Sequence, residues 1–110
     1  MFKPEMKPRF IRDGYLAVEN VFSETDLIPI RQRVDALIAD PEHPPEGVKV
    51  SREGNTAADK NSTEALNDDV RGAAFLVRFA PFFQDVARHP PLLECARGLL
   101  GPRVKVFRDQ

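Results

Sequence analysis

The stretch HPPLLECARGLLGPRVKVFRDQ, residues 89–110, decides the fold that the sequence predicts. Apolar residues at spacings of three and four predict a short helix after Pro90-Pro91, which ends at Gly101-Pro102. Its core face comprises Leu92, Leu93, Ala96, Leu99 and Leu100. Val104–Phe107 (VKVF) then predicts a strand. Because a strand needs partners for its N–H and C=O groups, we expect residues 1–110 to be the front part of a longer protein.

Upstream of this stretch, the pattern predicts one strand, one short helix and a long loop. AAFLVRF, residues 73–79, has the apolar character of a strand and is interrupted by Arg78. Pro81 suits the first turn of a helix, which the aromatic pair Phe82-Phe83 would give an apolar face. Residues 41–70 are polar and rich in turn-forming residues, so we expect a long polar loop, with a brief strand near residues 48–50.

The segment after Val21 predicts a helix that ends near Asp40. Ser23 and Asp26 have the spacing of a capping box, with Ser23 as the N-cap. Pro29 favours an alternative in which Asp26 is the cap, because the proline would then fall in the first turn, where its missing N–H costs nothing. In both cases the helix has one apolar stripe. The stripe comprises Leu27, Ile30, Val34, Leu37 and Ile38.

The N-terminal residues predict little regular structure. Residues 1–9 are charged and contain prolines, and we expect a mobile arm there, followed by a short strand over Tyr15–Val18. The expected order of elements is β, α, long loop, β, α, α, β. This order indicates an α+β fold within a single domain over residues 1–110, with helices that need a sheet to pack on.

Composition narrows the classes of partner and the compartment. The chain has 16 Lys and Arg against 17 Asp and Glu, so it has no basic excess for nucleic acid or an anionic membrane surface. It has no run of about 18 apolar residues, and its first ten residues have no signal-peptide pattern. The single cysteine, Cys95, fits a reducing compartment, and we expect a cytoplasmic protein.

The residue types that most often carry chemistry form no recognisable set. The two histidines, His43 and His89, are far apart and each precedes Pro-Pro, whereas a mononuclear metal site needs about three converging ligands. Cys95 lies beside the apolar stripe of its helix and is best explained as a small hydrophobic residue, although an enzyme that uses its thiol stays an open alternative. The sequence therefore predicts neither catalytic nor metal-binding residues.

Arg78 has a stronger signal than any of these, because a guanidinium within an apolar strand needs an anion. Two hypotheses follow. The anion is either a neighbouring carboxylate, Asp85 or Asp109, or it is a ligand that bears a carboxylate.

Three stretches carry a resemblance to a known family: FIRDGYLAVENVFS (residues 10–23), AFLVRFAPFF (residues 74–83) and residues 89–110. Together they resemble the N-terminal part of the phytanoyl-CoA dioxygenase family. The resemblance implies an Fe(II)- and 2-oxoglutarate-dependent hydroxylase with a double-stranded β-helix (jelly-roll or cupin-like) core and a small-molecule substrate. Residues 1–110 would supply its helical layer and flanking strands.

In such enzymes two histidines and a carboxylate hold the iron, the first two ligands in an H-x-D motif. This sequence contains no H-x-D, so the resemblance implies that residues 1–110 lack the iron site and are inactive alone. It also implies that Arg78 and Gln110 contact 2-oxoglutarate, since a basic residue and a pocket-lining side chain occupy similar strand positions in that family. The alternative is a small, non-enzymatic interaction module that uses the apolar helix faces of residues 27–38 and 92–100.

Overall fold

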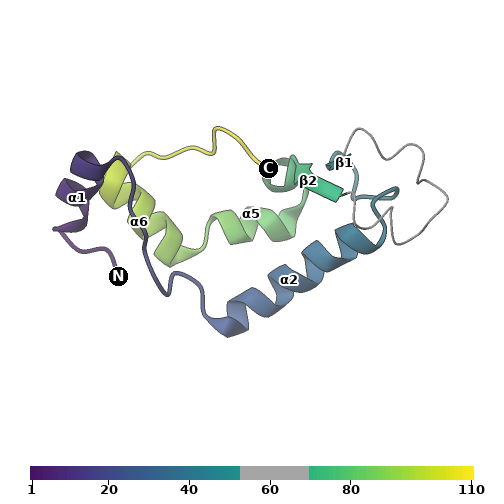
Figure 1. The fold of residues 1–110 in the computed structure, drawn as a ribbon, viewed down its shortest axis with the longest axis horizontal. Helices are drawn as coiled ribbons and strands as arrows, with labels where there is room; N and C mark the ends of the chain where they lie inside the picture. Colours follow the sequence, from purple (N-terminus) through teal and green to yellow (C-terminus); the bar gives the residue numbers. More distant parts are fainter. Residues whose placement is uncertain (53–69) are drawn as a thin grey trace.

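A computed structural model describes residues 1–52 and 70–110 of the chain. These residues form a small α+β structure in which helices precede and follow a two-stranded antiparallel sheet. The sheet lies at one end of the molecule (Figure 1). Its elements are α1 (Met6–Asp13), α2 (Glu24–Ala39), β1 (Lys49–Arg52), β2 (Val70–Ala74), α4 (Leu76–Phe79), α5 (Pro81–Ala87) and α6 (Pro90–Leu100). The predicted α+β class is confirmed, whereas the double-stranded β-helix stays a prediction.

The core lies where the end of α2 meets the sheet and the α4–α5 junction. Its buried residues are Leu37 from α2, Val48 just before β1 and Ala80 between α4 and α5. The partly buried side chains of Ala73, Leu76 and Phe83 pack against them. Gly47 has a left-handed φ of 85°, and a Cβ there would overlap the Phe79 ring, so this approach to the core requires glycine.

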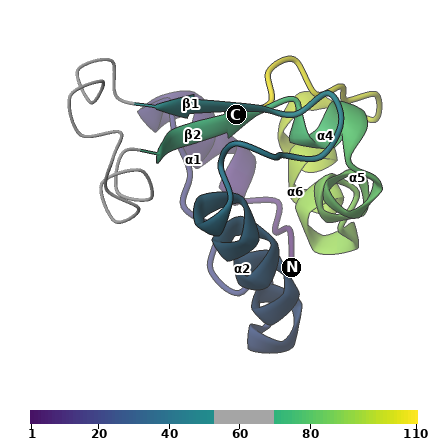
Figure 2. The ribbon, with the colours of Figure 1, turned by 90° about the vertical axis from the view of Figure 1, so that its right-hand side faces the viewer.

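The sheet joins β1, which lies within the long loop predicted over residues 41–70, to β2, which begins at the end of that loop. β1 and β2 run antiparallel and side by side, with Lys49 opposite Ala74 and a register shift between Ser51 and Arg52 (Figure 2). The brief strand expected near residues 48–50 is therefore present, slightly later in the chain. The interior of the predicted loop, residues 53–69, lies outside the described residues.

Helix α2 begins with the capping box. Ser23 Oγ accepts a hydrogen bond from the Asp26 N–H at 3.1 Å, and Asp26 Oδ2 accepts one from the Ser23 N–H at 2.9 Å. The alternative with Asp26 as the cap is therefore wrong. Pro29 lies inside the helix, which continues past it to Ala39. The proline removes one backbone hydrogen bond from the helix.

The N-terminal segment differs from the prediction. Helix α1 begins at Met6, within the expected arm, and ends at Gly14, whose left-handed backbone (φ 79°) directs its N–H to the Phe10 carbonyl at 2.8 Å. The Asp13-Gly14 pair, interpreted as a turn before a strand, is thus a helix end. Tyr15–Val18 is irregular, and the strand predicted there is wrong.

Of two further strand predictions, one is wrong in part and the other is wrong. The segment of residues 73–79 divides at Phe75, whose left-handed φ of 67° ends β2 and begins α4, so Arg78 lies on a short helix. Val104–Phe107 is irregular, because no strand in the part of the chain that the structure describes lies beside it to satisfy its backbone groups. The two short helices expected after Pro81 and Pro90 are confirmed as α5 and α6.

Two specific contacts join the N-terminal residues to α6. The Phe2 ring lies so close to Gly98 that a Cβ there would be 2.6 Å from it, which holds the N-terminus on α6. His89, at the start of α6, stacks on Phe22 at 4.4 Å and places Nε2 2.9 Å from the Val21 carbonyl oxygen. Of the helices in residues 1–52 and 70–110, none has the length and apolar character needed to span a bilayer.

Candidate functional site

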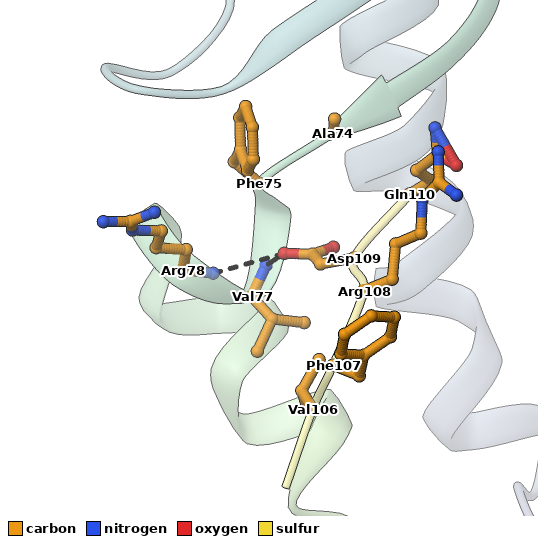
Figure 3. A pocket seen from close by; sticks show the side chains of 9 residues that line it. All are labelled: Ala74, Phe75, Val77, Arg78, Val106, Phe107, Arg108, Asp109 and Gln110. Carbon is orange, nitrogen blue, oxygen red and sulfur yellow. Dashed lines mark hydrogen bonds between the residues drawn. The ribbon is translucent and has the colours of Figure 1, made fainter.

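A hollow of about 470 Å³ lies between the start of α4 and the C-terminal segment (Figure 3). Its lining residues are Ala74, Phe75, Val77, Arg78, Val106, Phe107, Arg108, Asp109 and Gln110. The hollow therefore brings together Arg78 and Gln110, the two residues that the sequence analysis connected with 2-oxoglutarate.

Asp109 holds the C-terminal segment against α4. Its Oδ2 accepts hydrogen bonds from the backbone N–H groups of Val77 and Arg78, the latter at 3.2 Å. The Phe75 N–H donates to the Asp109 carbonyl oxygen, also at 3.2 Å. The first N–H groups of a helix have no partner within it, so Asp109 satisfies donors that α4 leaves open.

The guanidinium of Arg78 is directed away from this carboxylate. It is exposed and lies over the Phe79 ring, 5.3 Å from the ring centroid. Within residues 1–52 and 70–110 it forms no ion pair with Asp85 or Asp109, because Asp109 meets the backbone N–H of Arg78 instead. The hypothesis of a neighbouring carboxylate as the partner of Arg78 is therefore wrong for these two acids, and the guanidinium is available to a ligand.

Gln110 lies on the other side of the hollow. Figure 3 shows the side chains of Arg78 and Gln110 extending to opposite sides of Asp109, with Arg108 on the same side as Gln110. Both Arg108 and Gln110 are exposed. A ligand that reached Arg78 and Gln110 together would therefore span the hollow, with a cation near each of its ends.

Sequence reasoning missed the part that Asp109 and Arg108 play in this hollow. Asp109 was considered only as an ion-pair partner for the guanidinium of Arg78, and Arg108 was not singled out. The contact between Asp109 and the start of α4 joins residues that are 31 and 32 positions apart, and no local spacing indicates it.

The described residues offer no set of ligands for a metal ion. His43 pairs with Asp40, Nδ1 to Oδ1 at 2.9 Å, and this hydrogen bond raises the pKa of His43 above its ordinary value. His89 is engaged elsewhere, with Val21 and Phe22. Among residues 1–52 and 70–110, no group of three or more His, Cys, Asp and Glu side chains could hold a metal. Cys95 is buried on α6, as expected for a small hydrophobic residue.

Scans against models of protein families, against curated proteins and against solved structures match nothing. The resemblance to the phytanoyl-CoA dioxygenase family therefore rests on the three quoted stretches alone. Membership of that family, and the activity and cofactors that it implies for this chain, are therefore proposals.

Proposed function

We propose that this chain is the N-terminal part of an Fe(II)- and 2-oxoglutarate-dependent dioxygenase of the phytanoyl-CoA dioxygenase type. In that protein α2, α5 and α6 would form the helical layer on a double-stranded β-helix. One observation carries the proposal beyond the resemblance: Arg78 and Gln110, far apart in the sequence, line the same hollow.

The chemistry of the hollow suits a dicarboxylate such as 2-oxoglutarate. Arg78 and Arg108 present guanidinium groups, which bind carboxylates through paired N–H donors. The Gln110 amide adds two donors and an acceptor, which can pair with a keto or carboxylate oxygen. The one acid of the hollow, Asp109, is occupied by backbone donors and so competes less for the arginines.

The described residues suit 2-oxoglutarate but not iron, because they contain no group of three His, Cys, Asp or Glu side chains that could bind a metal ion. The sequence also contains no H-x-D. These residues would therefore hold the co-substrate, and the iron ligands would come from elsewhere in the protein. Residues 1–110 alone would have no hydroxylase activity, and 2-oxoglutarate would bind weakly to them, with a Kd on the order of 1 mM or above.

The direct test is to determine the coding sequence that follows codon 110. The proposal predicts an open frame that continues into an H-x-D motif and a later histidine, which would complete a facial triad. A stop codon directly after codon 110 in the intact transcript would overturn the proposal of an oxygenase. An open frame without H-x-D would do the same.

A further inference from the structure

A second, larger hollow is a groove of about 750 Å³ between α5, α6 and the C-terminal segment. Its floor is apolar. The side chains that form most of it are Leu92, Leu93, Ala96, Leu100, Val104 and Val106. Leu100 is 70% exposed and Val106 is 58% exposed, so apolar surface remains in contact with water. Such surface stabilises a complex when a partner covers it.

The charged residues that line the groove, here called its rim, are all basic among the described residues. Four of its lining residues are cations: Arg78, Arg88, Arg97 and Lys105. None of the groove's lining residues in the described part of the chain is acidic, although acids outnumber bases in the sequence as a whole, 17 to 16. The charges of the chain are therefore unevenly distributed, with a local positive potential over an apolar surface.

The four cations are not paired with carboxylates in the part of the chain that the structure describes. No ion pair joins Arg78, Arg88, Arg97 or Lys105 to an acid within residues 1–52 and 70–110. Elsewhere in the same residues, exposed cations do pair, as Arg12 does with Asp13 and Arg31 with Glu24. The rim thus presents charge that an acidic partner can neutralise.

We propose that this groove binds an acidic amphipathic helix of a partner protein. The cations come from four different segments: α4, the end of α5, α6 and the extended residues after Gly101. A single anionic head group offers one acidic group, whereas a helix with acids on both flanks of an apolar stripe offers several carboxylates to these cations. The stripe would fill the floor through side chains at positions i, i+3, i+4 and i+7.

This surface goes beyond the proposed enzyme, because neither iron nor 2-oxoglutarate takes part in it. The two sites share Val77, Arg78 and Val106, so the groove begins where the first hollow ends. The experiment below contains no co-substrate, so its failure is distinguishable from the failure of the proposed oxygenase.

The test uses a designed peptide of about 18 residues, or five helical turns, with Leu on one stripe and Glu on both flanks. Its control peptide has the same leucines and Lys in place of each Glu. We expect the acidic peptide to bind the chain with a micromolar Kd, measured by fluorescence polarisation, and to bind more weakly as salt is added. The basic peptide should bind at least about tenfold more weakly.

The variants locate the site on the groove. Arg97→Glu together with Lys105→Glu should weaken binding of the acidic peptide about tenfold or more, because two attractive charges become repulsive. Arg103→Glu is the matched control, an exposed cation near the groove that does not line it, and it should change Kd less than about twofold. Circular dichroism of each variant shows whether the fold is retained.

Amide chemical shifts provide a second measurement if a variant fails to fold. In the unsubstituted chain the acidic peptide should shift the amides of α6 and of residues 104–106. Equal binding of the two peptides, or shifts that lie outside the groove, would overturn the proposal. Binding of dodecanoate in place of the peptide would overturn it in favour of a lipid-like anion, and peptide-independent self-association would do so in favour of a second copy.

Discussion

The start of α2 and the start of α4 are both stabilised by an aspartate carboxylate, which is close in sequence at α2 and distant at α4. At α2 the carboxylate of Asp26 bonds Ser23, three residues away. At α4 the carboxylate of Asp109 bonds the N–H groups of Val77 and Arg78, more than thirty residues away. The first cap stabilises only its own helix, whereas the second also fixes a distant segment and thereby forms a hollow.

The difference between the two caps explains why the hollow lies beside α4 and not beside α2. A local cap forms as soon as its helix forms and depends on nothing else. A long-range cap exists only if the chain between its partners has folded. Loss of such a cap should therefore disrupt the hollow as well as the start of the helix. Substitutions and an acid titration can distinguish the local cap of α2 from the long-range cap of α4.

Asp109→Ala should have the largest effect. It removes a charged acceptor from two backbone donors, which costs roughly 1–3 kcal/mol, and it releases residues 104–110 from α4. Hydrogen exchange should show the amides of Val77 and Arg78 losing protection together, while the α2 amides keep theirs. Asp109→Asn, which retains an acceptor, should lose less; equal protection in all three proteins would contradict the long-range cap.

Ser23→Ala should have a smaller and strictly local effect. It removes the hydroxyl that accepts from the Asp26 N–H and should lower helix stability by about 1 kcal/mol. The amides of the first turn of α2 should exchange faster, and those of Val77 and Arg78 should not change. Faster exchange at α4 would show that the two caps are coupled and would break the comparison.

Acid should act on the local cap through Asp26. Hydrogen bonds from the Ser23 side chain, then from its backbone, lower the pKa of Asp26 below the ordinary value of 3.8. Because the folded-state pKa is the lower one, this contribution is fully present above about pH 4 and is lost as the pH falls through the folded-state pKa. Carboxyl NMR shifts in an acid titration should give Asp26 a pKa below 3.8, and Ser23→Ala should raise it; an Asp26 pKa at or above 3.8 would contradict the capping box.

The sequence predicted what local spacing controls. The capping box at Ser23, the helices that follow Pro81 and Pro90, and the α+β class are all present. Two of the predicted strands are absent because β pattern alone does not decide whether a partner strand is nearby. Tyr15–Val18 and Val104–Phe107 have no such partner in the described residues, and the left-handed backbone of Phe75 ends β2 early.

The candidate site was predictable only as two separate residues. Arg78 stood out because it interrupts an apolar run, and Gln110 entered through the resemblance. That they line one hollow depends on Asp109, a contact between segments that no spacing in the sequence indicates. The irregular end of the chain could not be predicted either, because its hydrogen bonds go to a helix start and not to a strand.

Arg78→Ala should have the smallest effect on stability. The cap uses the backbone N–H of Arg78, and the exposed guanidinium lies over the Phe79 ring, so the free energy of unfolding should change by less than about 0.5 kcal/mol. Thermal denaturation followed by circular dichroism measures this. A loss comparable with that of Asp109→Ala would show that the guanidinium has a structural task and is not available to a ligand.

Whether the hollow beside α4 holds 2-oxoglutarate is tested by titrating the ¹⁵N-labelled chain with 2-oxoglutarate to roughly 10 mM and following its amide shifts. We expect the amide shifts of residues 75–78 and 106–110 to change on addition of 2-oxoglutarate, and we expect these changes to disappear in Arg78→Ala. They should persist in Arg33→Ala, which removes another guanidinium that lies over a phenylalanine ring, 4.7 Å from Phe82. Shifts elsewhere in the chain, or shifts that survive equally in Arg78→Ala, would contradict the proposal that this hollow holds the co-substrate.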